Sequence, residues 1–284
     1  MYTISCLEHE YSCVHSKGRC FRGFFSLFLQ AVYGIHFAKK LDMPYRIDYG
    51  KLSYSYSEEA KFGGNNNFWD YYFLQDKPTD HRVEVLNSKF ENYPLKIWNR
   101  DFIKTLHREA FSEIKLQPRL QEEIVRIRAR FQNYKILGIH IRKTDHHQEV
   151  RPVEDSRYFQ LVQKHISRYD KLFIATDDQQ ILTRFEELYK DKVIAHPFYR
   201  SEGSEALHED SEKRGYELGR QALLDCYSLA SCDKVILSPS NLSYTALLIN
   251  PDLDYHLAES REATYNRWKT QLVYLLDKWG IRKW

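Results

Sequence analysis

The sequence predicts an α/β protein made of two Rossmann-like halves, and three observations support this class. Apolar runs typical of buried parallel strands alternate with helical segments between residues 135 and 250. Residues 2–49 carry a second, looser strand–helix–strand pattern. The length of 284 residues is sufficient for one large domain or two modest ones. We therefore expect two α/β halves with a boundary near residue 117.

The N-terminal half begins with a short apolar segment, residues 2–7, which we expect to form a strand. A loop rich in glycine and cations leads into a helix from Phe24, because apolar side chains then recur with helical spacing. This helix should end near residue 41, before Pro44. Alternation over residues 45–49 predicts the second strand.

Residues 50–90 are rich in Tyr and Asn and show little periodicity. The run from Gly63 to Asn67 is a loop signal, and we expect residues 68–73 to begin a helix. Two interpretations of this segment remain open. It is either a surface that binds a substrate or a loop whose aromatic side chains pack together.

The C-terminal half alternates regularly between strands and helices. Residues 118–134 give the clearest helix, because four large apolar side chains fall on one face. The other elements follow in order: strands at 135–141, 171–178, 192–196 and 233–238, with helices at 158–167, 179–189, 215–231 and 243–249.

The last 30 residues are also expected to form a helix. Its large apolar side chains are spaced for one face: Trp268, Leu272, Leu275, Leu276 and Trp279. We expect residues 256–284 to pack back on the rest of the protein.

The composition argues against several function classes. The 42 basic and 39 acidic side chains give a net charge of only +3, which does not favour nucleic-acid binding. No apolar stretch reaches 18 residues and no signal peptide is visible, so we expect a soluble, cytoplasmic protein without a membrane span. The aromatic content of 15%, including 21 Tyr, fits either a carbohydrate site or an ordinary core and rim.

The cysteines are expected to be reduced thiols. There are five in a long chain, and an odd number argues against a disulfide framework. No C-x-x-C pair suits zinc, and the adjacent His146 and His147 are poorly placed to chelate one ion from a loop. We therefore expect no metal site.

Three strands that follow one another along the chain end in polar side chains. Arg142-Lys143-Thr144-Asp145 follows the first, Thr176-Asp177-Asp178 follows the second, and Ser238-Pro239-Ser240-Asn241 follows the third. Ligands of open α/β sheets bind beyond the carboxyl ends of the strands. We therefore expect a ligand site at these three strand ends.

The residue types indicate a phosphorylated ligand. The Arg142 guanidinium suits a pair of phosphate oxygens, and the N–H groups of the Ser-rich helix start add donors, so together they would clamp a diphosphate from two sides. Asp177 or Asp178 would accept from ribose hydroxyls or a base. Each feature has a structural alternative, because serines and aspartates also cap helices and turns.

Two common nucleotide motifs are absent from the sequence. The missing G-x-x-x-x-G-K-[ST] argues against a P-loop kinase. The missing G-x-G-x-x-G after a strand argues against a dinucleotide dehydrogenase.

The three polar strand ends resemble the motifs of the fucosyltransferase superfamily, which comprises α1,6-, α1,2- and protein O-fucosyltransferases. Where the α1,6 branch has H-V-R-R-T-D, this chain has His140-Ile141-Arg142-Lys143-Thr144-Asp145. The family's second motif, an apolar run followed by A-T-D-D, resembles residues 173–178. The third, an Asp-bearing helix, a strand and a Ser-rich turn, resembles residues 225–241. The resemblance covers roughly residues 118–250.

The resemblance implies roles for individual residues. Arg142 matches the arginine that binds the donor β-phosphate and assists its departure. Asp225 matches a helix aspartate near the nucleotide, and Ser240 with Asn241 matches a Ser-Gln pair at the diphosphate. Lys143 replaces a second arginine of the family. The full set of expected donor contacts is His140, Arg142, Lys143, Asp177, Asp178, Asp225, Ser238, Ser240, Asn241 and Ser243.

The resemblance also implies the fold and the reaction. The fold would be GT-B-like, with two Rossmann-like halves facing a cleft. Residues 1–117 would form the acceptor-side domain, residues 118–255 the nucleotide-sugar domain, and residues 256–284 a helical segment. The reaction would be an inverting, metal-independent glycosyl transfer without a cofactor. The favoured donor is GDP-fucose, and the acceptor would be a hydroxyl of a glycan or oligosaccharide.

The catalytic base has three candidates. Glu149, in the loop after the first motif, is the first choice, and Asp145 is the second. Asp48, at the end of an N-terminal strand, is the third. The residues expected on the acceptor side, or alternatively in a charged surface loop, are His15, Lys17 and Arg22.

Two alternatives to this function remain open. The same scaffold would serve another donor, such as UDP-xylose or a rhamnose nucleotide. The chain would otherwise be a non-catalytic module that binds a nucleotide sugar or a glycan.

Overall fold

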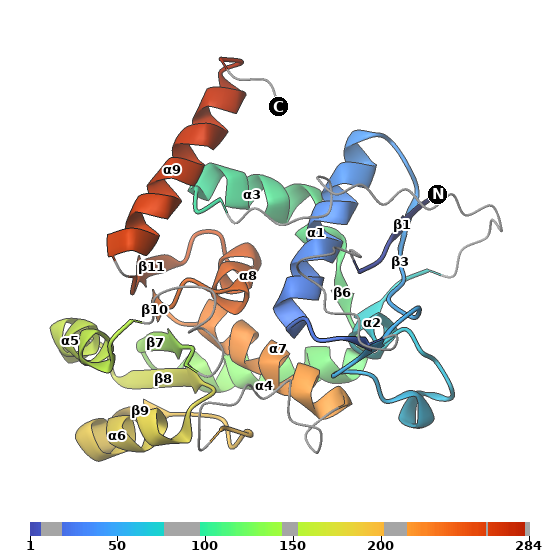
Figure 1. Cartoon of the computed structure of the whole chain (residues 1–284). Helices are drawn as coiled ribbons and strands as arrows, with labels where there is room; N and C mark the ends of the chain where they lie inside the picture. Colours follow the sequence, from blue (N-terminus) through green and yellow to red (C-terminus); the bar gives the residue numbers. More distant parts are fainter. Residues whose placement is uncertain (7–18, 77–96, 144–152, 202–214, 260, 282–284) are drawn as a thin grey trace. The chain divides into compact units, whose positions relative to one another are not determined.

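A computed structural model describes residues 1–6, 19–76, 97–143, 153–201, 215–259 and 261–281 (Figure 1). The chain divides into two compact units, each assembled from separate stretches of sequence. The first unit comprises Met1–Leu95, Thr105–Arg126 and His208–Leu224, and the second comprises Lys96–Lys104, Ile127–Leu207 and Asp225–Trp284. The expected domain limits at residues 117 and 255 stay a prediction.

The first unit contains the predicted strand–helix–strand pattern. Strand β1 (Tyr2–Ile4) pairs in parallel with β3 (Tyr45–Ile47), and helix α1 (Phe24–Lys40) connects them. Smaller elements complete the unit: β2 (Arg19–Cys20) parallel to β4 (Ser53–Tyr54), β5 (Phe73–Leu74) antiparallel to β6 (Lys115–Leu116), the 3₁₀ turns η1 (Glu59–Phe62) and η2 (Phe111–Glu113), and α2 (Trp69–Tyr72).

Aromatic rings fill the core of the first unit. Trp69 lies 4.2 Å from Phe73 between ring centroids, and Tyr49 stacks on Phe68 at 5.2 Å. All four side chains are at most 2% exposed. For Phe68, Trp69 and Phe73, the interpretation of residues 50–90 as a loop whose aromatic side chains pack together is therefore confirmed, and residues 77–90 lie outside the described residues.

The second unit is built on a parallel five-stranded sheet. Its spatial order is β11 (Asp254–Leu257), β10 (Lys234–Leu237), β7 (Ile136–Ile141), β8 (Lys171–Thr176) and β9 (Val193–Ile194). The other elements of this unit are α5 (Asp155–His165), η3 (Ile166–Arg168), α6 (Gln179–Tyr189), η4 (Lys190–Lys192) and α8 (Asn241–Ile249). Two helices are divided between the units, since α4 (Pro118–Phe131) and α7 (Tyr216–Ala230) begin in the first and end in the second. The α/β class is confirmed, and the regular alternation predicted after residue 135 is present.

The strand order creates a switch point between β7 and β10. From β7 the chain adds β8 and β9 on one side, and it then returns to add β10 and β11 on the other (Figure 1). Ligands of open α/β sheets bind where the strand order reverses in this way. The carboxyl ends of three neighbouring strands meet here, since His140 is in register with Leu237, and Ile141 with Thr176.

Gly138 leaves room for two side chains that pack over β7. A Cβ atom built on Gly138 would lie 2.8 Å from Cys232 Sγ and 2.9 Å from Val235 Cγ1. Both distances are too short for real Cβ contacts, so Cys232 and Val235 occupy the space that a side chain at position 138 would take.

Helix α9 (Arg261–Lys278) forms as predicted, but its apolar face is not the face that packs. The helix packs through Gln271, which donates to the Trp98 carbonyl, and Tyr274, whose ring lies 5.2 Å from Phe102 at the start of α3 (Arg100–Glu109). Three members of the predicted stripe face outward, since Trp268, Leu272 and Trp279 are 64%, 55% and 63% exposed, whereas Leu275 and Leu276 are half-buried. No helix in the described part of the chain is both long and apolar enough to span a bilayer.

The four described cysteines are free thiols, as predicted. Cys6, Cys20, Cys226 and Cys232 are all buried. Cys13 lies outside the described residues.

Candidate active site

The candidate site lies at the carboxyl ends of β8, β7 and β10 in the second unit. The three polar strand ends that the sequence predicted are neighbours there, because these strands are adjacent in the sheet. Arg142 is the first residue beyond the central strand β7, and its side chain is partly exposed. Different chemistry flanks it on the two sides.

On the β10 side, the buried Ser238 hydroxyl joins three segments. It donates to the His140 carbonyl (3.0 Å) and accepts from the Arg142 N–H (3.3 Å). The Tyr158 hydroxyl lies 2.8 Å away, and it must be the donor because Ser238 has given its one proton to His140. Burial raises the pKa of Tyr158 to about 12, so its proton stays in place at neutral pH. These three bonds use the whole hydrogen-bonding capacity of Ser238.

The same side carries the start of α8. Ser240 caps this helix by accepting from the Ser243 N–H (3.1 Å), and its hydroxyl also donates to Ser243 Oγ (3.2 Å). His140 Nδ1 lies 2.8 Å from Ser243 Oγ, and all three side chains are at most 6% exposed. The N–H groups of Asn241 and Leu242 have no acceptor within the helix, so they are suited to an anion.

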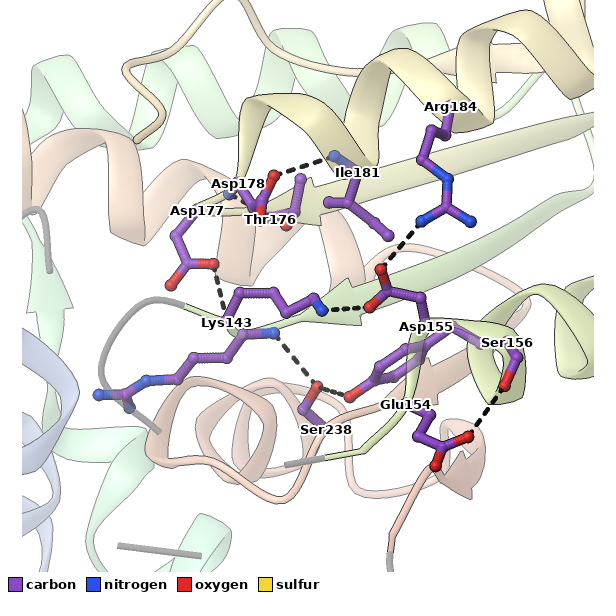
Figure 2. A network of polar contacts seen from close by, with 12 residues as sticks. Lys143, Glu154, Asp155, Ser156, Thr176, Asp177, Asp178, Ile181, Arg184 and Ser238 are labelled. Atoms are coloured by element: carbon purple, nitrogen blue, oxygen red, sulfur yellow. Dashed lines mark hydrogen bonds and ion pairs between the residues drawn. The ribbon is translucent and has the colours of Figure 1, made fainter. Parts of the chain in front are cut away.

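On the β8 side, the cation next to Arg142 is held in an ionic network (Figure 2). The Lys143 ammonium forms an ion pair with Asp155, and Arg184 binds the other Asp155 oxygen at 2.9 Å. The Lys143 backbone N–H also donates to Asp177 Oδ1 (3.0 Å). Lys143 and Asp155 are about a quarter exposed, at 25% and 29%, so solvent weakens these charges only in part.

Asp178 acts as a helix cap. Its Oδ1 accepts from the Ile181 N–H (2.9 Å), and it occupies the N-cap position of α6. Asp177 and Asp178 therefore both make structural hydrogen bonds at the end of β8, where Figure 2 shows them side by side. Their expected contacts with the donor stay a prediction.

Asp225 is a partly buried residue on α7. Burial raises its pKa to about 7, although the nearby Arg200 guanidinium acts in the opposite direction. Its Oδ1 is shielded from solvent and has no hydrogen-bond partner among the described residues. Arg200 donates instead to the carbonyls of Phe198 and His196, at 3.1 and 2.8 Å. The adjacent Cys226 thiol contacts the Leu242 carbonyl (3.5 Å), which brings α7 to the first turn of α8.

The remaining candidate residues fall elsewhere. Asp145, Glu149, His15 and Lys17 lie outside the described residues. Asp48 belongs to the first unit and accepts from the Gly50 N–H (2.9 Å). Arg22 also belongs to the first unit and is partly exposed. The structure therefore brings together the candidates of the second unit, and the choice of base stays a prediction.

Sequence reasoning missed four residues that organise the site. Tyr158, Asp155 and Arg184 bind across strand ends, and Arg200 lies beside Asp225. Tyr158 and Asp155 occupy the first turns of the helix that follows the β7 loop. Their position at the start of this helix is the only sequence feature that points to Tyr158 and Asp155 as site residues, because their partners are distant in sequence.

This protein is a glycosyltransferase of the fucosyltransferase superfamily and has a GT-B fold. The switch point and the residues at its strand ends agree with this class. Residues 95–269, more than half of the chain, match the family model described as Nodulation protein Z (NodZ). The chain therefore belongs to the NodZ family.

Solved structures of NodZ proteins share this fold. A NodZ alpha-1,6-fucosyltransferase soaked with GDP-fucose is 18% identical, with a TM-score of 0.54 over 87% of this chain and 91% of that one. The fucosyltransferase NodZ from Bradyrhizobium is 19% identical, with a TM-score of 0.53 over 87% of this chain and 92% of that one. No curated protein matches the chain in sequence.

Proposed function

We propose that this protein is an inverting, metal-independent fucosyltransferase that transfers L-fucose from GDP-fucose to a hydroxyl of a glycan. The observation that carries the proposal is the position of Arg142, directly beyond the central strand at the switch point and beside the start of α8. Membership of the NodZ family supports it, and so does the shared fold with a NodZ enzyme soaked with GDP-fucose.

In the proposed reaction, a carboxylate takes the proton of the acceptor hydroxyl. The acceptor oxygen forms a bond to the anomeric carbon from the face opposite the diphosphate, while the bond from that carbon to the diphosphate oxygen breaks. Negative charge then develops on the leaving phosphate. Arg142 and the free N–H groups of Asn241 and Leu242 stabilise that charge, which is the electrostatic effect that usually dominates such catalysis.

The surrounding residues have distinct proposed roles. Ser238 positions the Arg142 backbone, because its hydroxyl has no capacity left for a ligand. His140 and Ser243 hold the start of α8 against β7. Asn241 contacts the diphosphate, and Asp225 lies near the nucleotide. Among the carboxylates, Glu149 is the proposed base, with Asp145 and Asp48 as the second and third choices.

An Arg142→Ala variant tests the proposal. We expect transfer from GDP-fucose to a glycan library to fall by about 10²–10³, because one contact to the developing charge is lost. The melting temperature should not change, since Arg142 is partly exposed. The matched control is Arg130→Ala, which removes an exposed arginine at the end of α4 and should leave transfer intact.

Donor screening and chelation test the finer parts. GDP release from GDP-fucose should persist in EDTA, and UDP-xylose and dTDP-rhamnose should give none. Turnover of only a UDP- or dTDP-sugar would overturn the donor assignment. If the wild-type protein binds GDP-fucose but transfers to no glycan, the chain is a binding module instead.

A further inference from the structure

The outward face of α9 is an exposed stripe of large apolar side chains. Tyr265, Trp268, Leu272 and Trp279 are 70%, 64%, 55% and 63% exposed. The Trp279 N–H still donates to the Leu275 carbonyl (3.0 Å), so the helical turn continues through it. With 3.6 residues per turn, these four side chains fall within an arc of about 60°. We call them the α9 stripe.

Packing within the second unit fixes the direction of the α9 stripe. Tyr274 lies on the face opposite the stripe and contacts Phe102, and Gln271 lies between the two faces and donates to the Trp98 carbonyl. Arg267, on the same side as these two, is held by Glu259 at 2.6 Å. The helix is therefore anchored through its more polar side, which is the reverse of an ordinary surface helix.

Positive charge accompanies the α9 stripe. Residues 261–284 contain six Lys and Arg side chains and two acidic ones, a net charge of +4, whereas the whole chain has only +3. The positive excess of the protein therefore resides in its last 24 residues, and the rest of the chain is slightly acidic. Lys269 and Lys278 are exposed, and Lys269 lies next to the stripe on the helix surface. Three of the five tryptophans also lie in this segment.

We propose that the α9 stripe docks on the surface of an anionic lipid bilayer, with the helix lying in the plane of the interface. A helix that presents Trp and Leu on one face with Lys and Arg around it suits this position, because apolar burial and attraction to anionic headgroups add together. The indole ring suits the boundary between apolar and wet surroundings. A second copy of this chain is a less suitable partner, because its C-terminal segment, also with a net charge of +4, would repel the first one.

Co-sedimentation of the full chain with vesicles tests this proposal. We expect binding to vesicles of phosphatidylcholine with phosphatidylglycerol, and at least about tenfold weaker binding to phosphatidylcholine alone. Tryptophan emission should shift to the blue on binding. Trp69 and Trp98 are only 2% and 8% exposed, so the shift reports on the C-terminal tryptophans.

Two pairs of variants separate the apolar and electrostatic contributions. Trp268→Ser with Leu272→Ser should weaken binding at least about tenfold, whereas Leu188→Ser, at a site 63% exposed on α6, should not. The double variant Lys269→Glu, Lys278→Glu should also weaken vesicle binding. Its control is the double variant Lys51→Glu, Lys164→Glu, which changes the net charge equally at other exposed sites and should have less effect.

Three outcomes would overturn the proposal. The first is no binding to the anionic vesicles. The second is a dimer in solution that the Trp268→Ser and Leu272→Ser variant dissociates, with vesicle binding unchanged, which would assign the stripe to a second copy. The third is a lower melting temperature of that variant without any lipid effect, which would assign the stripe to the stability of the chain itself.

Discussion

The two flanks of Arg142 are built from different chemistry. On the β10 side, neutral hydroxyls and one imidazole are buried and fully engaged, with Ser238 alone joining three segments. On the β8 side, Lys143, Asp155 and Arg184 form ion pairs that are partly open to solvent. The neutral flank is therefore the rigid one. On the ionic flank, the charge of Lys143 is paired with Asp155.

The difference between the flanks predicts different responses to salt. Hydrogen bonds between neutral groups keep their strength in salt, whereas partly exposed ion pairs are screened. The neutral flank carries the first backbone N–H groups of α8, which have no acceptor within the helix. The variants below perturb one flank at a time, except for Asp225→Asn, which changes a carboxyl on α7 next to the Cys226 contact with α8.

The largest expected effect is on the pH dependence of stability and concerns Asp225. Asp155 forms ion pairs with Lys143 and Arg184, whereas the Oδ1 atom of Asp225 is shielded from solvent and has no hydrogen-bond partner among the described residues. Its pKa is raised from 3.8 to about 7, so the folded protein binds this proton more tightly than the unfolded chain. The stabilisation is complete below about pH 4 and is lost as the pH rises through about 7, at up to about 1.4 kcal/mol per unit. Urea unfolding of wild type between pH 4 and 8 measures it.

The Asp225→Asn variant is the test of that assignment. It should flatten the stability profile between pH 4 and 7. The control is Asp252→Asn, at a carboxylate 79% exposed, which should leave the profile unchanged. A profile of Asp225→Asn that is as steep as that of wild type would assign the slope to other groups.

The next effect is on the neutral flank. Ser238→Ala should lower the free energy of unfolding by about 1–3 kcal/mol, because it leaves the buried Tyr158 hydroxyl without its partner. Transfer should fall as well, since the Arg142 N–H loses its acceptor. Adding Tyr158→Phe to Ser238→Ala should recover part of the stability. Full additivity of the two changes would contradict the hydrogen bond between them.

A matched pair of helix caps gives a smaller effect. Ser240→Ala and Asp178→Ala should each cost about 1 kcal/mol, because each removes the side chain that caps a helix. Only Ser240→Ala should weaken GDP binding measured by calorimetry, since α8 starts beside Arg142. An equal loss of GDP affinity in Asp178→Ala would assign Asp178 to the nucleotide as well as to the cap.

The smallest effect is on the ionic flank. Asp155→Asn breaks both ion pairs and should destabilise the protein by at most about 1 kcal/mol, since the partners are partly exposed. Raising NaCl from about 0.05 to about 0.5 M should reduce this difference, because salt screens exposed charges. The effect of Ser238→Ala should stay constant over the same range. Salt dependence of both would remove the distinction between the flanks.

The sequence predicted the sheet of the second unit because its central strands read as apolar runs. Residues 136–141, 171–176 and 234–237 are such runs, and their polar ends meet because parallel strands share an edge. Strand β11 was not predicted, because Asp254 and His256 interrupt its apolar pattern. Polar side chains are tolerated there because β11 lies at the edge of the sheet.

The missed site residues illustrate a different limit. Asp155 and Tyr158 reach Lys143 and Ser238 only because of where the chain re-enters the fold, and no local pattern encodes that return. The α9 stripe is a third case. Its spacing predicts which side chains share a face, but the neighbour of that face depends on contacts made by Gln271 and Tyr274.

Gly138 has a consequence for the geometry of the reaction centre. Any side chain there would have to displace the Cys232 thiol or the Val235 methyl group, both of which are buried over β7. Cys232 belongs to the segment that leads into β10, the strand whose end carries Ser238. The packing behind the proposed anion donors thus depends, in the dry interior, on the lack of a single methyl group four positions before the arginine.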